Sequence, residues 1–204
     1  MRDNNIDMWI VMSREGNFDP LYPNMGKGYV GKNGYYIFTD PGEGRIERAA
    51  LGVGGYFLKE GGAYDHFGAE EELKSYVEDR DPQRIGLNIS KSIGGADGLS
   101  HSGYLELEEI LGETYAERFV SAEKLVSDFR SQRVASEIAA FSEACELSYT
   151  IAEKAMSNAV IKIIERGDVL MLDFGVGLMN MYTDMKRIAY VLRRETRVPD
   201  GTIN

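Results

Sequence analysis

The chain has 204 residues, a formal net charge of −10 and a pI near 4.8. Nucleic acids and anionic membranes are bound through basic surfaces, so this charge, without any Lys/Arg-rich run, argues against both as partners. One cysteine excludes an intrachain disulfide and fits a reducing compartment. The short apolar run near the N-terminus matches neither a signal peptide nor a membrane span. We therefore expect a cytoplasmic protein of one large or two small domains.

Strand-like and helix-like patterns alternate through the first two thirds of the chain. Predicted strands cover 6–12, 34–40 and 84–90, a strand pair or bend covers 48–58, and predicted helices cover 69–80, 103–113 and 121–131. The spacing of Leu73, Tyr76 and Val77, for example, is helical, and acidic residues fill the first turn before them. Such alternation predicts an α/β domain over residues 1–130, with a mixed sheet flanked by helices.

Several motifs in the chain imitate functional sites. "GKGYVG" at 26–31 satisfies the dinucleotide pattern, but Pro23 precedes it and a strand-like run follows, so we predict an ordinary loop. His66 and His101 stand in glycine-rich segments without metal-ligand spacing, which favours surface histidines. Cys145 falls on the predicted apolar face of a helix, where a small buried side chain is expected rather than a catalytic thiol.

The last third contains a long amphipathic helix followed by two strand-like runs. Ser136 is a plausible N-cap, and Ile138, Phe141, Cys145, Ala152 and Met156 recur at helical spacing over 136–156. The runs "VLMLDFGV" and "MYTDMKRIAYVL" follow, separated by "GLMN", which is typical of a hairpin loop. Residues 131–204 are therefore predicted to form a second, α+β unit.

Two aspartates, Asp173 and Asp184, lie inside these strand-like runs, where aspartate is uncommon. If the turn centres between Leu178 and Met179, the two aspartates sit directly opposite each other on one face. Like charges in that position repel, so something must compensate. Either one carboxyl is protonated, or both reach solvent at an edge, or a cation is held between them.

The stretch 167–187, "GDVLMLDFGVGLMNMYTDMKR", resembles the metal-binding hairpin of the pita-bread metallopeptidases. A "GD" turn leads into the strand with the first aspartate, and the second follows eleven residues later in a "DMKR" context. The helix "SEIAAFSEACELSYTIAEKAM" is similar to the one that opens the catalytic domain of that family. Residues 1–130 resemble the N-terminal domain of its aminopeptidase P, prolidase and creatinase branch.

The resemblance implies a metal-dependent aminopeptidase that acts on Xaa-Pro peptides through a metal-activated water. In the family, two aspartates, one histidine and two glutamates hold two divalent ions, so Asp173 would chelate one metal and Asp184 would bridge both. Oxygen-rich ligation favours manganese, with cobalt and zinc as alternatives. A homodimer is usual in the branch. The alternatives left open are a creatinase-like amidinohydrolase and a non-catalytic dimerisation or binding module.

The chain departs from the family pattern after Asp184. The twenty residues that follow contain no histidine and one glutamate, Glu195, so the other three ligands and the general acid/base have no assigned counterpart. The family also places further helix and strand, with an active-site histidine, between "EKAMSNAVI" and "KIIERGDV". Missing segments, a truncated product and a natural remnant all remain open explanations. We expect an incomplete pita-bread domain over 131–204 without peptidase activity.

Overall fold

The computed structural model describes residues 1–26, 28–158, 164–179 and 181–193. The chain divides into two compact units, which we call unit 1 (Met1–Gln132) and unit 2 (Arg133–Asn204). Unit 1 is a mixed α/β domain, so the α/β fold class predicted from the sequence is confirmed. No helix in the described part of either unit is both long and apolar enough to cross a bilayer.

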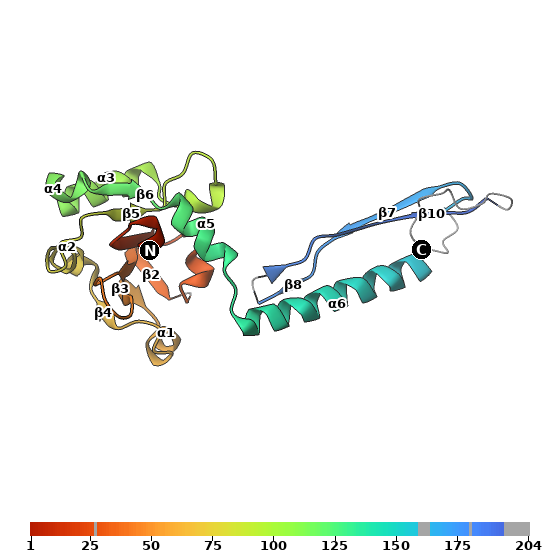
Figure 1. The fold of residues 1–204 in the computed structure, drawn as a ribbon, viewed down its shortest axis with the longest axis horizontal. Helices are drawn as coiled ribbons and strands as arrows, with labels where there is room; N and C mark the ends of the chain where they lie inside the picture. The colour runs from red at the N-terminus through yellow and green to blue at the C-terminus, as the bar shows by residue number, and fades with distance from the viewer. Residues whose placement is uncertain (27, 159–163, 180, 194–204) are drawn as a thin grey trace. The chain divides into compact units, whose positions relative to one another are not determined.

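Unit 1 is built on a six-stranded sheet with the strand order β4-β3-β2-β1-β5-β6 (Figure 1). Its strands are β1 (Met8–Ser13), β2 (Tyr29–Thr39), β3 (Glu47–Gly54), β4 (His66–Gly68), β5 (Ile85–Leu87) and β6 (Phe119–Ser121). The strands β1, β2 and β3 pair antiparallel, whereas β5 joins β1, β6 joins β5 and β4 joins β3 in parallel. The sheet is therefore mixed, as predicted.

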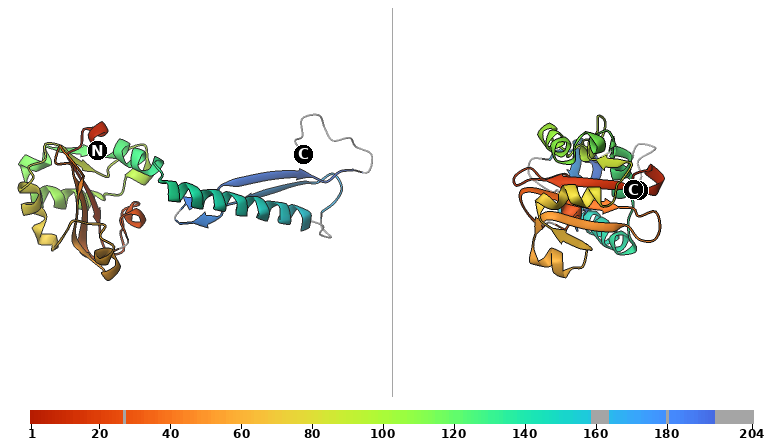
Figure 2. Two further views of the ribbon diagram at one scale, coloured as in Figure 1. Left: turned by 60° about the horizontal axis from the view of Figure 1, so that its bottom comes forward. Right: turned by 90° about the vertical axis from the view of Figure 1, so that its left-hand side faces the viewer.

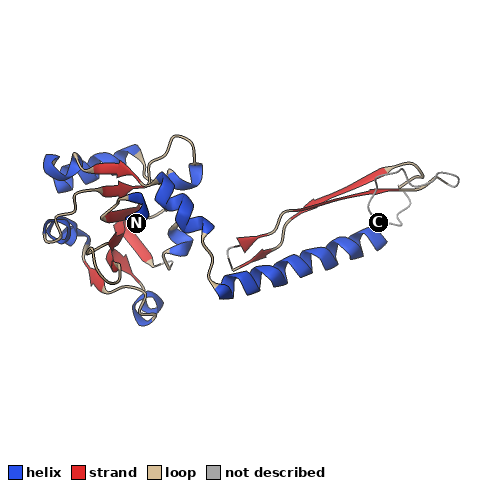
Figure 3. Ribbon diagram, in the orientation of Figure 1, coloured by secondary structure: helices blue, strands red, loops and turns tan. Residues whose placement is uncertain are grey.

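Helices cover both faces of this sheet (Figure 3). They are α1 (Tyr56–Glu60), α2 (Leu73–Glu78), α3 (His101–Leu111), α4 (Glu113–Ala116) and α5 (Glu123–Ser131), with 3-10 turns at Arg2–Asn4, Tyr22–Asn24, Glu70–Glu72 and Gly94–Ala96. One core cluster packs the sheet against α1 and α5, and the other packs it against α2 and α3. The result is a three-layer arrangement with two hydrophobic cores.

Strand β1 lies in the middle of the sheet, and all six of its residues are buried. Met8, Ile10 and Met12 enter the core beneath α2 and α3, whereas Trp9 and Val11 enter the core beneath α5. A strand covered on both faces needs a continuous apolar run, and "MWIVM" supplies one.

A buried polar chain connects β1 to the neighbouring loops. The indole nitrogen of Trp9 donates to Asn88 Oδ1 at 2.8 Å, and Asn88 Nδ2 donates to Asp19 Oδ2 at 2.9 Å. The other oxygen of Asp19 accepts from the Leu21 backbone N–H at 2.8 Å. Burial raises the pKa of the Asp19 carboxyl, against the opposing effect of these hydrogen bonds. Because one amide satisfies two buried partners, Asn88 holds this part of unit 1 together.

A bulge interrupts the β2–β3 pairing between Val30 and Tyr35. It turns Asn33 inward, where its side chain accepts from Arg14 Nε at 2.9 Å and donates to Glu106 at 2.8 Å. Gly52 of β3 makes room for the bulge: it has φ +64°, and a Cβ built on it would lie 2.3 Å from the Asn33 carbonyl oxygen. Only glycine fits both the conformation and the space.

In its described residues, unit 2 has one long helix beside a β-hairpin (Figures 1 and 2). Its elements are α6 (Ala135–Asn158), β7 (Val169–Phe174), β8 (Gly177–Leu178), β9 (Met181–Tyr182) and β10 (Met185–Tyr190). The helix buries a narrow stripe of Ala144, Ser148 and Ala152. A pita-bread arrangement is not visible in the described residues, and the junction at 159–163 and Glu195 lie outside them.

Two local predictions need correction. Cys145 is exposed rather than buried, because the helix buries only the stripe beside it. Residues 29–31 of "GKGYVG" belong to β2 rather than to a loop, since the bulge lets this strand extend further back. The histidines lie at the surface, as predicted: His101 begins α3 and is exposed, and His66 begins β4, where 42% of its side chain is exposed and its ring stacks on Tyr76 with centroids 5.7 Å apart.

Candidate functional site

The predicted site residues Asp173 and Asp184 lie on the same hairpin of unit 2. Asp173 is in β7, and Asp184 immediately precedes β10. Burial alternates along β7, with Asp173 on the exposed side, and Asp184 is exposed on the side of the second strand that also carries Lys186 and Ile188. The structure therefore brings the two carboxylates to one face, as the hairpin prediction required.

The register predicted for this hairpin is wrong. Asp173 pairs with Lys186, and the pairing continues through Gly177–Tyr182 and Leu178–Met181, which places Asp184 across from Gly175. The loop begins at Met179, which has φ +50°, so the turn is centred one residue later than predicted. Moving the centre of the turn by one residue shifts the partner of each residue by two positions along the strand. Every side chain therefore stays on the same face of the hairpin.

Lys186 compensates part of the negative charge on this face. Its Nζ lies 3.6 Å from Asp173 Oδ2, and both side chains are more than half exposed. Asp184 is a diagonal neighbour of Asp173 rather than a direct one, a separation of ~7–8 Å in a regular sheet. The repulsion that motivated a bound cation is therefore weaker than predicted, and an exposed ion pair of this kind contributes little stability.

The two carboxylates fit a divalent ion only in part. Both supply the oxygen atoms that hard cations prefer, but they share the face with an ammonium group. Within the described residues, no group of three His, Cys, Asp or Glu side chains could hold a metal. A two-metal centre therefore needs ligands beyond those that the structure describes, and at most one loosely held ion matches the two aspartates alone.

The break between the β7–β10 and β8–β9 pairings lies beside the aspartates, and it is held by residues that the sequence did not single out. Thr183 Oγ1 lies 2.7 Å from the Ser148 hydroxyl of α6 and accepts from the Val176 N–H at 2.9 Å. A Cβ on Gly175 would lie 2.3 Å from the Thr183 carbonyl oxygen, so the strands approach closely there. The contact between the buried Ser148 and Thr183, which lies between β9 and β10, orients the hairpin, including Asp184, on the helix. An indication of this contact was present in the sequence, because Ser148 is a polar residue on the apolar side of the helix predicted over 136–156.

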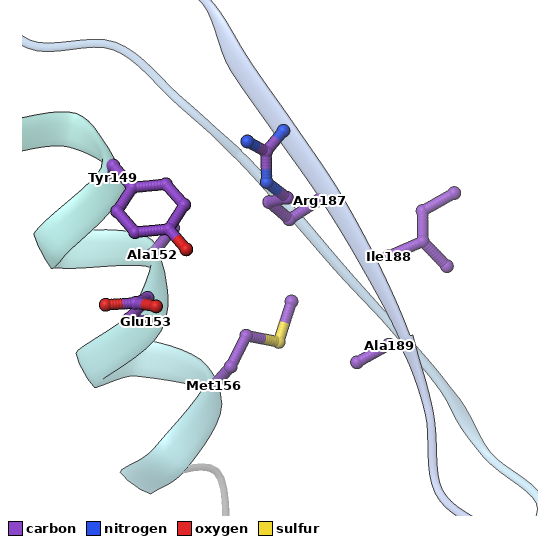
Figure 4. A pocket seen from close by; sticks show the side chains of 7 residues that line it. All are labelled: Tyr149, Ala152, Glu153, Met156, Arg187, Ile188 and Ala189. Atoms are coloured by element: carbon purple, nitrogen blue, oxygen red, sulfur yellow. The ribbon is translucent and has the colours of Figure 1, made fainter. Parts of the chain in front are cut away.

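A groove of ≈ 560 Å³ separates α6 from β10 on the opposite side of the hairpin (Figure 4). Its walls are Tyr149, Ala152, Glu153 and Met156 from the helix and Arg187, Ile188 and Ala189 from the strand. Figure 4 shows Ala189 directed toward the helix and Ile188 directed away from it. A hydrogen bond to Glu153 raises the pKa of the Tyr149 hydroxyl. The groove is mostly apolar and is not continuous with the aspartate face.

In comparisons with known proteins, no family model, no curated protein and no solved structure matches this chain.

Proposed function

We propose that the chain carries the aspartate hairpin of a metal-dependent aminopeptidase of the Xaa-Pro type. The observation that supports this proposal is the placement of Asp173 and Asp184 on one exposed face of a single antiparallel hairpin. The motif resemblance of residues 167–187 supplies the chemistry and the substrate class. The proposed substrate is a peptide with proline at its second position.

The two aspartates would hold a divalent ion, and manganese suits their oxygen ligands, with cobalt and zinc as alternatives. Such an ion lowers the pKa of a bound water and polarises a carbonyl group. The chain's own contribution is geometric: the Thr183–Ser148 contact fixes the hairpin on α6, and Lys186 limits the net charge of the face. No described residue is assigned as general acid or base.

The metal proposal predicts one weak site for a divalent ion on this 204-residue chain. Equilibrium dialysis with manganese should give no more than one ion per chain, and both Asp173→Asn and Asp184→Asn should weaken its binding by at least about tenfold. An assay on a Xaa-Pro peptide should show no turnover, because three family ligands have no counterpart in the described residues.

Asp79→Asn is the matched control, since this exposed aspartate lies in unit 1, and its loss should leave manganese binding unchanged. Equal binding by the two hairpin variants and the parent chain would remove the metal proposal. Two tightly held ions, or measurable turnover, would instead show that other residues complete the site.

A second candidate function, self-association through a non-catalytic module, is favoured by the apolar side chains on the same face. Val169, Met171 and Ile188 expose 64%, 66% and 71% of their surface. A surface of this kind is unusual unless another surface covers it. It also carries Asp173 and Lys186, so a two-fold symmetric copy could set each charge against its opposite.

This candidate predicts a homodimer that Ile188→Lys dissociates. A buried lysine without a partner opposes association, so light scattering should show the parent as a dimer and the variant as a monomer at the same concentration. Leu105→Lys, on an exposed helix position of unit 1, is the control and should remain dimeric. A monomeric parent chain would exclude the candidate.

A further inference from the structure

Strand β10 has one edge to which no other strand pairs within the described residues, while β7 occupies its other edge. The direction of its backbone groups follows from the β7 pairing, in which the Val191 N–H donates to the Asp168 carbonyl at 2.9 Å. Because these groups alternate along an antiparallel strand, Lys186, Ile188 and Tyr190 direct their N–H and C=O groups toward the open edge. Such an edge can pair with another extended chain.

The groove between α6 and β10 runs along this open edge (Figure 4). Its strand side consists of three consecutive residues, Arg187, Ile188 and Ala189. Successive side chains of a strand point to opposite faces, and Figure 4 shows Ile188 directed away from the helix. The groove therefore reaches the backbone of β10 as well as its helix-facing side chains. A chain paired with the open edge would place every second side chain in the groove.

The helix wall of this groove belongs to the apolar repeat of α6 that the hairpin leaves partly uncovered. Ala152 and Met156 are members of that repeat, and Tyr149, which is 51% exposed, adds an aromatic ring. A second hollow of ≈ 370 Å³ lies between α6 and β9, and its apolar side chains are Ile138, Phe141, Met181 and Tyr182. Apolar side chains at alternate positions of an added strand would cover such a surface.

One cation in the groove has no ion pair within the part of the chain that the structure describes. The guanidinium group of Arg187 donates to the carbonyl of its neighbour Lys186 at 3.0 Å, and most of its five N–H donors remain for another acceptor. The carboxylate on the helix wall, Glu153, accepts a hydrogen bond from Tyr149. Lys186 pairs with Asp173 on the opposite face of the hairpin. A carboxylate on an added strand would therefore find Arg187 available.

We propose that the open edge of β10 binds an extended peptide as an added strand. The peptide carries an acidic residue opposite Arg187 and apolar residues two positions before and after it. Backbone hydrogen bonds to Ile188 and Tyr190 supply affinity, while the groove and Arg187 select the side chains. The inference does not rest on the proposed metal chemistry, because Asp173 and Asp184 lie on the other face of the hairpin.

The test uses the peptide acetyl-Thr-Val-Thr-Glu-Thr-Val-Thr-amide, which is titrated into the full chain and followed by backbone amide NMR. Binding should be saturable and should slow the hydrogen exchange of the Ile188 and Tyr190 amides, whereas the amides of unit 1 should not change. A peptide with glutamine in place of the glutamate should bind about fivefold more weakly.

Two N-methylated forms of the peptide distinguish strand pairing from simple occupation of the groove. One form carries N-methyl groups on its threonines, and the other carries them on its valines and glutamate. Only alternate N–H groups of a strand face its neighbour, so one form should lose binding and the other should retain it. This comparison uses the parent chain and needs no variant that has to fold.

Variants of the chain test the role assigned to Arg187. Arg187→Gln should weaken binding of the glutamate peptide about fivefold and leave binding of the glutamine peptide unchanged. Lys186→Gln is the matched control, since it removes the adjacent cation on the opposite face and should leave both affinities unchanged.

The absence of saturable binding, equal affinities of the two N-methylated forms, or equal losses in Arg187→Gln and Lys186→Gln would each overturn the proposal. Protection of the Ile188 and Tyr190 amides that rises with chain concentration, without any peptide, would show that a second copy of the chain occupies the edge instead.

Discussion

Asn88→Leu is expected to lower the free energy of unfolding of unit 1 by about 3–5 kcal/mol. Leucine has a similar size but can neither accept from the Trp9 indole nor donate to Asp19, and both partners are buried. The Trp9 N–H would lose its acceptor and the Asp19 carboxylate one of its donors. Urea unfolding followed by Trp9 fluorescence measures the loss, since this is the only tryptophan in the chain.

Asn24→Leu is the control for this experiment, because Asn24 is exposed and the same change there removes no buried hydrogen bond. We expect it to alter the free energy of unfolding by no more than about 0.5 kcal/mol. A loss in Asn88→Leu that does not exceed that of the control would mean that the amide bridge contributes nothing to stability.

Gly52→Ala is expected to destabilise unit 1 by about 3–5 kcal/mol. The left-handed conformation at φ +64° costs a residue with a Cβ about 1–2 kcal/mol. The new methyl group would also meet the Asn33 carbonyl oxygen at 2.3 Å, and a backbone atom cannot move aside without disturbing the bulge. The same fluorescence-detected unfolding measures this variant.

Gly62→Ala separates the two contributions. Gly62 has φ +60°, close to the value at Gly52, but a Cβ placed on it would meet no atom within 4 Å beyond its own chain neighbours. It should therefore lose only the conformational part, about 1–2 kcal/mol. Equal losses in the two variants would show that the bulge tolerates a methyl group and that the close approach to Asn33 has no energetic weight.

The sequence predicted well wherever a regular pattern decides the structure. The buried run at 6–12 became β1, and the long helical repeat became α6. Strands β4 and β6 were not predicted, because three residues are too few to show an alternation; β5 is as short, but it lies inside the longer run predicted as a strand over 84–90. The length of β2 was underestimated because its bulge hides the period of two.

The candidate site was predicted only in outline. Both aspartates lie on one face, since this depends on alternation along the strands, but the partner of Asp173 is Lys186. That pairing depends on which residue begins the turn, and "GLMN" lacks the Asn-Gly or Asp-Gly pair that would have fixed it. Similarly, the helical repeat named Ile138 and Phe141 as core residues, whereas the hairpin covers a different stripe centred on Ser148.

The central position of β1 has a consequence for how the protein is made. Its antiparallel neighbour β2 leaves the ribosome soon afterwards, so one edge of β1 can pair early. The other edge waits for β5, whose first residue, Ile85, pairs with Met8. Until then a strand whose first five residues are apolar presents unpaired backbone groups at a sheet edge, which is a hazard for association with other chains. Unit 1 is therefore expected to need protection during synthesis, until residues 85–87 have emerged.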